Sequence, residues 1–182
     1  MRRSVMALLS IIACAGLAIA QQVGTEHDRT FDFSKIQTFA VKTAAPANDA
    51  GADNGAREAI TKRLMEKGWK PADENSCDAL VVVHVASKGK DTMQAFYEAA
   101  PDMKWQNVGA PKLADSDDYE YKPGTLVVDI FEAKTRRAIF RGVAVNRNPE
   151  NAEILDKEAK KMFKSLPTAS KSPKSASATQ QP

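Results

Sequence analysis

Residues 124–145 constrain the fold most, because two runs of alternating residues flank a short turn there. The turn is Ala133–Arg136. Before the turn, Leu126, Val128 and Ile130 alternate with Thr125, Val127 and Asp129. After the turn, Ile139, Arg141, Val143 and Val145 alternate with the residues between them. A period of two is the pattern of a half-buried strand. Two such runs joined by a short turn predict a β-hairpin.

Three other stretches have strand character. Asp78–Ala86 is rich in β-branched residues and apolar on both faces, which predicts a central strand covered on each side. Thr38, Phe39 and Val41 suit a pleated, half-buried surface and predict another strand. We also expect a short strand over Val23–Asp28.

A helical period appears between residues 54 and 69, with an apolar stripe at Ala56, Ile60 and Leu64. Asn54 is the expected N-cap. Gly68 stands where a left-handed residue ends a helix, so Trp69 is expected to fold back on Leu64 and join the core.

A second helix is predicted near the C-terminal end, with Asn148 as its cap and Pro149 as its first residue. Its apolar stripe is Leu155, Ala159, Met162 and Leu166. Pro167 ends it.

These elements predict an α+β fold, a two-layer sandwich in which a mostly antiparallel sheet carries two helices. The expected single domain spans residues 21–167, a length that suits one core. Residues 168–182 are rich in Ser, Ala, Lys and Pro, and we expect this tail to be disordered.

The first twenty residues resemble a signal peptide. Arg2 and Arg3 precede an apolar run to Ile19, and the small residue Ala20 stands before Gln21 as at a signal-peptidase site. We expect residues 1–20 to be removed between Ala20 and Gln21. The protein is then exported, to the periplasm or the cell envelope.

Two alternatives to this cleavage remain. Cys14 follows Ile11-Ile12-Ala13, which resembles the lipidation box of bacterial lipoproteins. Acyl chains at Cys14 would make the protein an outer-membrane lipoprotein, and only then is a membrane an expected partner. A retained membrane anchor is less favoured, because a spanning helix needs about 20 apolar residues.

Charge and cysteine content exclude some classes of function. Loss of Arg2 and Arg3 lowers the 26 basic residues to 24 against 23 acidic ones, a formal net charge of +1. Nucleic-acid binding needs a clustered basic face, so we expect no nucleic-acid partner. Cleavage after Ala20 also leaves Cys77 as the one cysteine, which excludes an internal disulfide.

Residues 87–122 lack a clean period, and long connections in compact domains are often functional. Five aromatic residues lie in this segment: Phe96, Tyr97, Trp105, Tyr119 and Tyr121. They predict a surface for a ligand or partner. The alternative is that the rings cover one face of the sheet.

The sequence offers no catalytic or metal-binding pattern. The acidic run at residues 115–120 lacks the glycine turn of a calcium loop, and His84 has no second ligand near it. Cys77 and His84 lie too far apart on one strand to form a nucleophile pair. We therefore expect no catalytic residue, no metal and no cofactor.

Several strings resemble the bacterial domain of unknown function 4136 family: residues 32–39 (DFSKIQTF), 64–69 (LMEKGW), 78–82 (DALVV) and 124–129 (GTLVVD), with Arg141-Gly142. The resemblance covers nearly all of the expected domain and implies an exported or lipid-anchored envelope protein without an assigned activity. Phe140 stands where the family usually places tryptophan. The Cys14 box is weaker than in the lipoprotein members.

These features predict a non-catalytic module of the cell envelope with a binding or assembly role, whose partner is an envelope protein, a lipid or a wall component. The alternative is an envelope hydrolase with a site assembled from distant segments. Its candidate residues are Asp129, Arg141 and His84.

Overall fold

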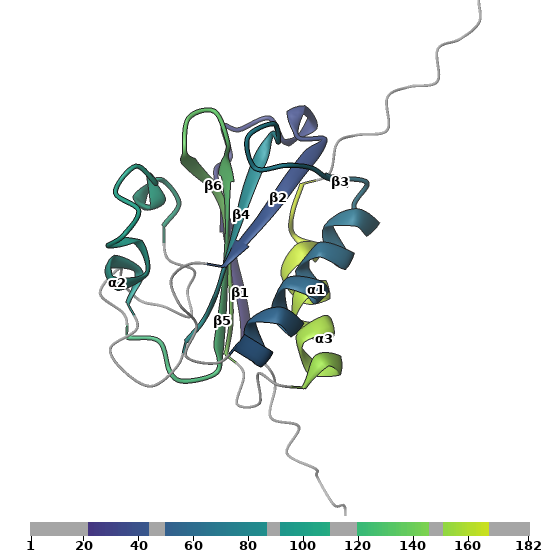
Figure 1. Cartoon of the computed structure of the whole chain (residues 1–182), viewed down its shortest axis with the longest axis vertical. Coiled ribbons are helices and arrows are strands. Elements are labelled where there is room, and N and C mark those ends of the chain that lie inside the picture. Colours follow the sequence, from purple (N-terminus) through teal and green to yellow (C-terminus); the bar gives the residue numbers. More distant parts are fainter. Residues whose placement is uncertain (1–21, 44–49, 87–91, 110–119, 146–150, 168–182) are drawn as a thin grey trace, which may run out of the picture.

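The computed structural model describes residues 22–43, 50–86, 92–109, 120–145 and 151–167, which contain one six-stranded sheet of order β1-β6-β5-β4-β2-β3. The strands are β1 (Gln22–His27), β2 (Thr38–Thr43), β3 (Lys70–Pro71), β4 (Ala79–Val85), β5 (Thr125–Glu132) and β6 (Arg137–Val145). The helices are α1 (Ala50–Glu66), α2 (Met93–Tyr97) and α3 (Ala152–Lys164), with 3-10 turns η1 (Phe33–Lys35) and η2 (Trp105–Asn107). Figure 1 shows the sheet nearly edge-on, with α1 and α3 on one side and α2 on the other. The predicted α+β class is confirmed.

The hairpin predicted at residues 124–145 is confirmed as β5 and β6. Antiparallel pairing joins β1 to β6, β6 to β5 and β5 to β4, whereas β4–β2 and β2–β3 are parallel. The turn ends at Arg136, whose φ of 57° is unusual for a residue with a side chain. The sheet is therefore mostly antiparallel with a parallel edge.

The parallel edge arises because α1 crosses over the sheet between β2 and β3. Gly68, with φ of 93°, donates its N–H to the carbonyl of Met65, and Trp69 donates to Leu64. This is the predicted Schellman ending, and Trp69 is buried. The predicted start is wrong, because α1 begins at Ala50 and Asn54 lies inside it.

Helix α3 is confirmed, but its cap differs from the prediction. Asn151 is the N-cap, and its side chain accepts a hydrogen bond from the N–H of Ile154. Asn148 and Pro149 lie outside the described residues. The predicted helix began too early, because both asparagines are good caps and only the observed geometry distinguishes them.

Helices α1 and α3 cover one face of the sheet and form a helix-side core with it. Its central members are Phe39, Ile60, Leu64, Trp69, Val81, Val83, Leu126, Val128, Ile130, Phe140, Leu155, Met162 and Phe163. The rings of Phe140 and Phe163 lie 5.8 Å apart, so the phenylalanine in place of the family's tryptophan packs against α3.

The opposite face is covered by residues 92–109, which we call the covering segment, together with Tyr121. This loop-side core consists mainly of Leu80, Val82, Val127, Phe131 and Val143 from the sheet and Met93, Tyr97, Met103, Trp105, Val108 and Tyr121 from its cover. The sequence had indicated neither α2 nor η2. Both are a turn or so long, too short to show a helical period.

Candidate functional site

A cluster of buried polar residues lies between the sheet and the covering segment. It contains His84 of β4, Asp129 of β5 and Arg141 of β6, the three residues of the hydrolase alternative. Register places Val82 opposite Asp129 and Asp129 opposite Arg141, so strands far apart in sequence bring these side chains to one face.

Asp129 and Arg141 form an ion pair with no exposed surface on either side chain. Arg141 Nε donates to Asp129 Oδ1 over 2.7 Å, and its two terminal nitrogens donate to the carbonyls of Val108 (3.1 Å) and Trp105 (3.0 Å). Burial lowers the pKa of Arg141, but the charge of Asp129 opposes this and the net pKa is raised. The guanidinium therefore stays charged and fastens the covering segment to the sheet.

Tyr97 supplies a second tie from the covering segment. Its hydroxyl donates to Asp129 Oδ2 over 2.6 Å. Burial and then the neighbouring Asp129 charge raise the pKa of Tyr97 well above 10, so the phenol stays neutral and acts as a donor. Both oxygens of Asp129 are thus occupied by groups of the protein itself.

His84 completes the cluster as a neutral ring. It stacks on Phe96, with ring centroids 4.2 Å apart, and meets Tyr97 edge-on at 5.2 Å. Burial lowers the pKa of His84 to about 4, against opposition from the Asp129 charge. Its Nε2 has no hydrogen-bond partner among the described residues.

The five aromatic residues of the predicted ligand surface have different surroundings. Tyr97, Trp105 and Tyr121 are at most 7% exposed and pack in the loop-side core, as the sheet-covering alternative expects. Phe96 is half-buried and stacks on Tyr121 at 5.6 Å. Tyr119 lies outside the described residues. Of the four rings that lie in the described ranges, Phe96 is the one that is not fully buried.

The structure gives less support to the other predicted sites. Cys77 is half-buried, and burial raises the pKa of its thiol, which disfavours the reactive thiolate. Within the described ranges, no group of three or more His, Cys, Asp and Glu residues is arranged to hold a metal ion. Cys14, Ala20, Gln21 and the acidic run at residues 115–119 lie outside those ranges.

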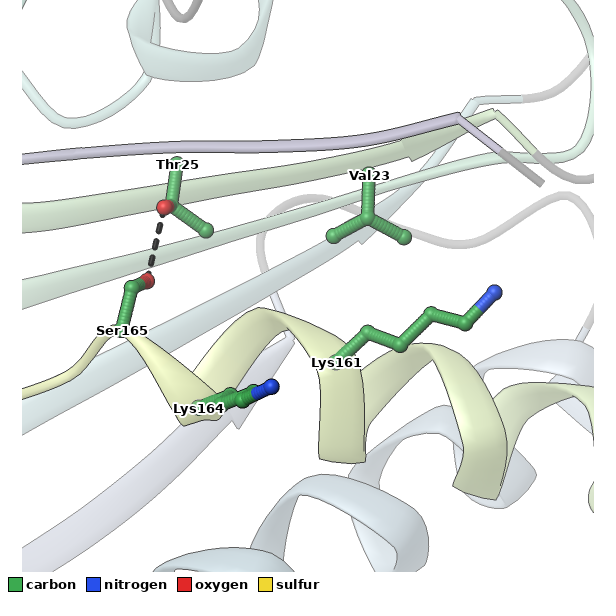
Figure 2. A pocket seen from close by; sticks show the side chains of 5 residues that line it. All are labelled: Val23, Thr25, Lys161, Lys164 and Ser165. Carbon is green, nitrogen blue, oxygen red and sulfur yellow. Dashed lines mark hydrogen bonds between the residues drawn. The ribbon is translucent and has the colours of Figure 1, made fainter. Parts of the chain in front are cut away.

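A surface hollow lies between β1 and α3 (Figure 2). Val23 and Thr25 of β1 lie along one side, and Lys161, Lys164 and Ser165 line it from α3 and its C-terminal end. Thr25 Oγ1 and Ser165 Oγ are hydrogen-bonded over 2.7 Å and tie the strand to the helix. None of these five residues was singled out from the sequence. Lysines near a helix C-terminus are common, and only the fold places them beside an edge strand.

Among the residues that the structure describes, strand β1 lies at one edge of the sheet and pairs with β6 alone. The register ends with His27 opposite Phe140, and just beyond it the N–H of Asp28 donates to the carbonyl of Ile139 over 2.9 Å. Main-chain groups alternate in direction along an antiparallel strand. The N–H and C=O groups of Val23, Thr25 and His27 therefore point away from β6, along the outer edge.

None of the helices in the described part of the chain is both long enough and apolar enough to span a membrane.

Several solved structures are similar to this chain, and the first of them supports the fold. A DUF4136 family protein from Bacteroides thetaiotaomicron superposes with a TM-score of 0.53 at 14% identity, covering 79% of this chain and 94% of its own. A PDZ domain protein from Parabacteroides distasonis gives 0.49 at 17% identity, covering 79% and 35%. A PelC dodecamer from Paraburkholderia phytofirmans gives 0.47 at 6% identity, covering 79% and 94%.

Comparison with curated proteins finds no match. The sequence model of one family, described as "Domain of unknown function (DUF4136)", matches residues 23–168. That range includes every strand and helix described above, except for Gln22 at the start of β1, and most of the chain. The chain therefore belongs to the domain of unknown function 4136 family.

Proposed function

We propose that this protein is a non-catalytic module of the cell envelope that binds or helps to assemble another envelope component. The observation that carries the proposal is the outer edge of β1, where main-chain groups point outward beside the hollow lined by Lys161 and Lys164. An exposed edge strand is a ready template for another chain. The signal-like residues 1–20 support the envelope as the place of action.

The geometry of the polar cluster supports a structural role for the residues that a hydrolase would need. Asp129 and Arg141 have no exposed surface, His84 is 3% exposed, and the carboxylate is bonded to Arg141 and Tyr97. A hydrolytic residue must reach its substrate. No observation in this cluster favours the hydrolase alternative.

Site-specific photocrosslinking in intact cells tests the proposal. A photoreactive amino acid at position 164, beside the hollow, is expected to give a discrete crosslinked species in the envelope fraction. The matched control carries the same amino acid at position 65, where Met65 is 53% exposed on α1. Equal crosslinking at both positions, no discrete species at position 164, or a protein found in the cytosol with residues 1–20 attached would contradict the proposal.

A further inference from the structure

Two adjacent rings of α2 cover one histidine of the sheet. Phe96 stacks on His84 with ring centroids 4.2 Å apart, and Tyr97 meets the same imidazole edge-on at 5.2 Å. His84 itself is 3% exposed. Because both rings lie against the imidazole, its contact with water increases when α2 moves away from the sheet.

Helix α2 is attached to the sheet by its side chains. The hydroxyl of Tyr97 donates to Asp129 Oδ2 over 2.6 Å, and Met93 and Tyr97 are buried. The N–H of Phe96 bonds to the carbonyl of Thr92, within the covering segment itself. A helix of five residues that is held in this way opens at lower free energy than the sheet beneath it.

The charge around His84 disfavours a proton on the ring while α2 is closed. The charged and titratable groups facing the ring from the elements around it are Asp129 (β5), Arg141 (β6), Tyr97 (α2), Tyr121 next to Phe96, and, diagonally across β2, Lys42 with its partner Glu74. Both oxygens of Asp129 are already bonded, to Arg141 and Tyr97. A proton on the closed ring would therefore add a second buried positive charge beside Arg141, with the carboxylate that acts on the ring already in use.

Burial makes the protonation of His84 depend on the position of α2. In the closed form it lowers the pKa of His84 to about 4, whereas the ordinary pKa of the imidazole is 6.5. As the pH falls below 6.5, the open form takes up the proton first, and this uptake favours opening until the closed form is also protonated near pH 4. The free energy of opening therefore decreases between pH 6.5 and 4.

We infer that α2 is an acid-released cover: a proton taken up from water by His84 frees α2 from the loop-side face while the helix-side core stays folded. Release breaks the hydrogen bond from Tyr97 to Asp129 Oδ2 and exposes the imidazole. This regulatory device lies on the face of the sheet and does not depend on binding at the β1 edge, so it goes beyond the proposed function.

Hydrogen exchange of the full-length protein, read by NMR, tests the inference. The reporters are the amides of Phe96 and Ala100, which bond to the carbonyls of Thr92 and Tyr97. Their protection factors, which divide out the direct effect of pH on exchange, are expected to fall about 25-fold between about pH 7.5 and about pH 5, from the two pKa values of the histidine. A local opening exposes little surface, so this exchange is expected to respond weakly to urea below the unfolding transition.

Two variants separate the proton from the hydrogen bond. His84→Phe keeps a ring under Phe96 and takes up no proton, so the fall in protection with acid is expected to disappear. The matched control, Tyr97→Phe, keeps the ring beside His84 and removes the bond to Asp129. Its protection factors are expected to be lower at both pH values, by about tenfold or more for a bond to a charged group, with the same further fall in acid.

Melting temperatures of both variants, compared with the parent, show whether the fold is retained. If phenylalanine disrupts the core, His84→Gln provides a second side chain that takes up no proton. The imidazole resonances of His84 give a check in the parent protein, where the ring is expected to titrate near pH 4.

Four results would overturn the inference. The first is a fall in protection that persists without a titrating group at position 84. The second is loss of the acid response in Tyr97→Phe as well. The third is a steep response to urea at Phe96 and Ala100, equal to that of the α1 amides, which would mean that α2 opens only with the whole fold. The fourth is titration of the closed ring near its ordinary value, which would remove the driving force.

Discussion

At the scale of single residues, the ion pair of Asp129 and Arg141 is the interaction whose loss should cost most. Asp129→Asn leaves the Arg141 charge buried without a counter-charge, and breaking a buried pair in this way costs about 3–5 kcal/mol. Chemical denaturation measures the change in the free energy of unfolding. Glu153→Gln breaks the exposed pair with Lys157 and should cost about 0.5 kcal/mol or less. Similar losses in the two variants would contradict the structural role of Asp129.

Removing both charges should be milder than removing one. Asp129→Leu together with Arg141→Met leaves no unpaired buried charge, so the loss should fall below that of Asp129→Asn. The carbonyls of Trp105 and Val108 would still lose their donors, and part of the cost remains. If the double variant is less stable than Asp129→Asn, these carbonyl bonds contribute more to stability than the charge pair does.

His84 should make the fold sensitive to acid. Its pKa is about 4 in the folded state and 6.5 as the ordinary value, so the unfolded chain takes up the proton first. Its contribution is complete above pH 6.5 and is lost as the pH falls towards 4, with a slope of up to about 1.4 kcal/mol per pH unit. The charges acting on the ring are those of Asp129 and Arg141. Denaturation curves recorded across this pH window measure the slope.

One variant isolates His84 from the carboxylates that also titrate in acid. His84→Phe keeps a ring in the stack and should flatten the slope between pH 6.5 and 4. An unchanged slope in His84→Phe would place the acid sensitivity elsewhere.

At the scale of elements, the contact between β6 and α3 depends on a missing side chain. A Cβ at Gly142 would lie 2.2 Å from Met162 Cγ, so Gly142→Ala should cost about 1–3 kcal/mol by overpacking. Met162→Ala opens a cavity and also destabilises the fold. The double variant Gly142→Ala with Met162→Ala should lose less stability than the sum of the losses in the two single variants. Thermal or chemical unfolding measures this cycle.

A second glycine provides the control for that cycle. A Cβ at Gly109 would meet nothing within 4 Å, so Gly109→Ala should change stability little. Additive losses for Gly142→Ala and Met162→Ala would show that α3 moves away from β6 instead of clashing.

The elements that could be predicted from the sequence are those with a period of their own. Alternation is explicit in residues 124–145, and Gly68-Trp69 carries the signature of a helix end, so both agreed with the structure. The two-residue strand β3 and the short helix α2 offer no period to read. The hollow between β1 and α3 could not be predicted from such periods, because Val23 and Lys161 lie far apart in sequence and only the strand order reveals β1 as an edge.

At the scale of the whole molecule, the sheet separates two cores that are covered by different kinds of segment. The helix-side core is closed by two long helices, whereas the loop-side core is closed by the covering segment with short helical turns. Lys104 of that segment makes two main-chain bonds to the hairpin, with Arg136 and Ala138, and the contacts of Tyr97 and Arg141 described above add side-chain ties. Segments held in this way open at lower free energy than a core sheet.

The two tryptophans test this division, since each lies in one core. Trp105 stacks on Tyr97 at 6.1 Å and lies 5.7 Å from the Arg141 guanidinium carbon. Trp105→Ala should therefore speed hydrogen exchange in residues 92–109 while the amides of α1 keep most of their protection. Trp69→Ala, in the helix-side core, should lower protection throughout the described domain, because β2, β4 and α1 share that core. Uniform loss of protection in Trp105→Ala would mean that the covering segment and the sheet open as one cooperative unit.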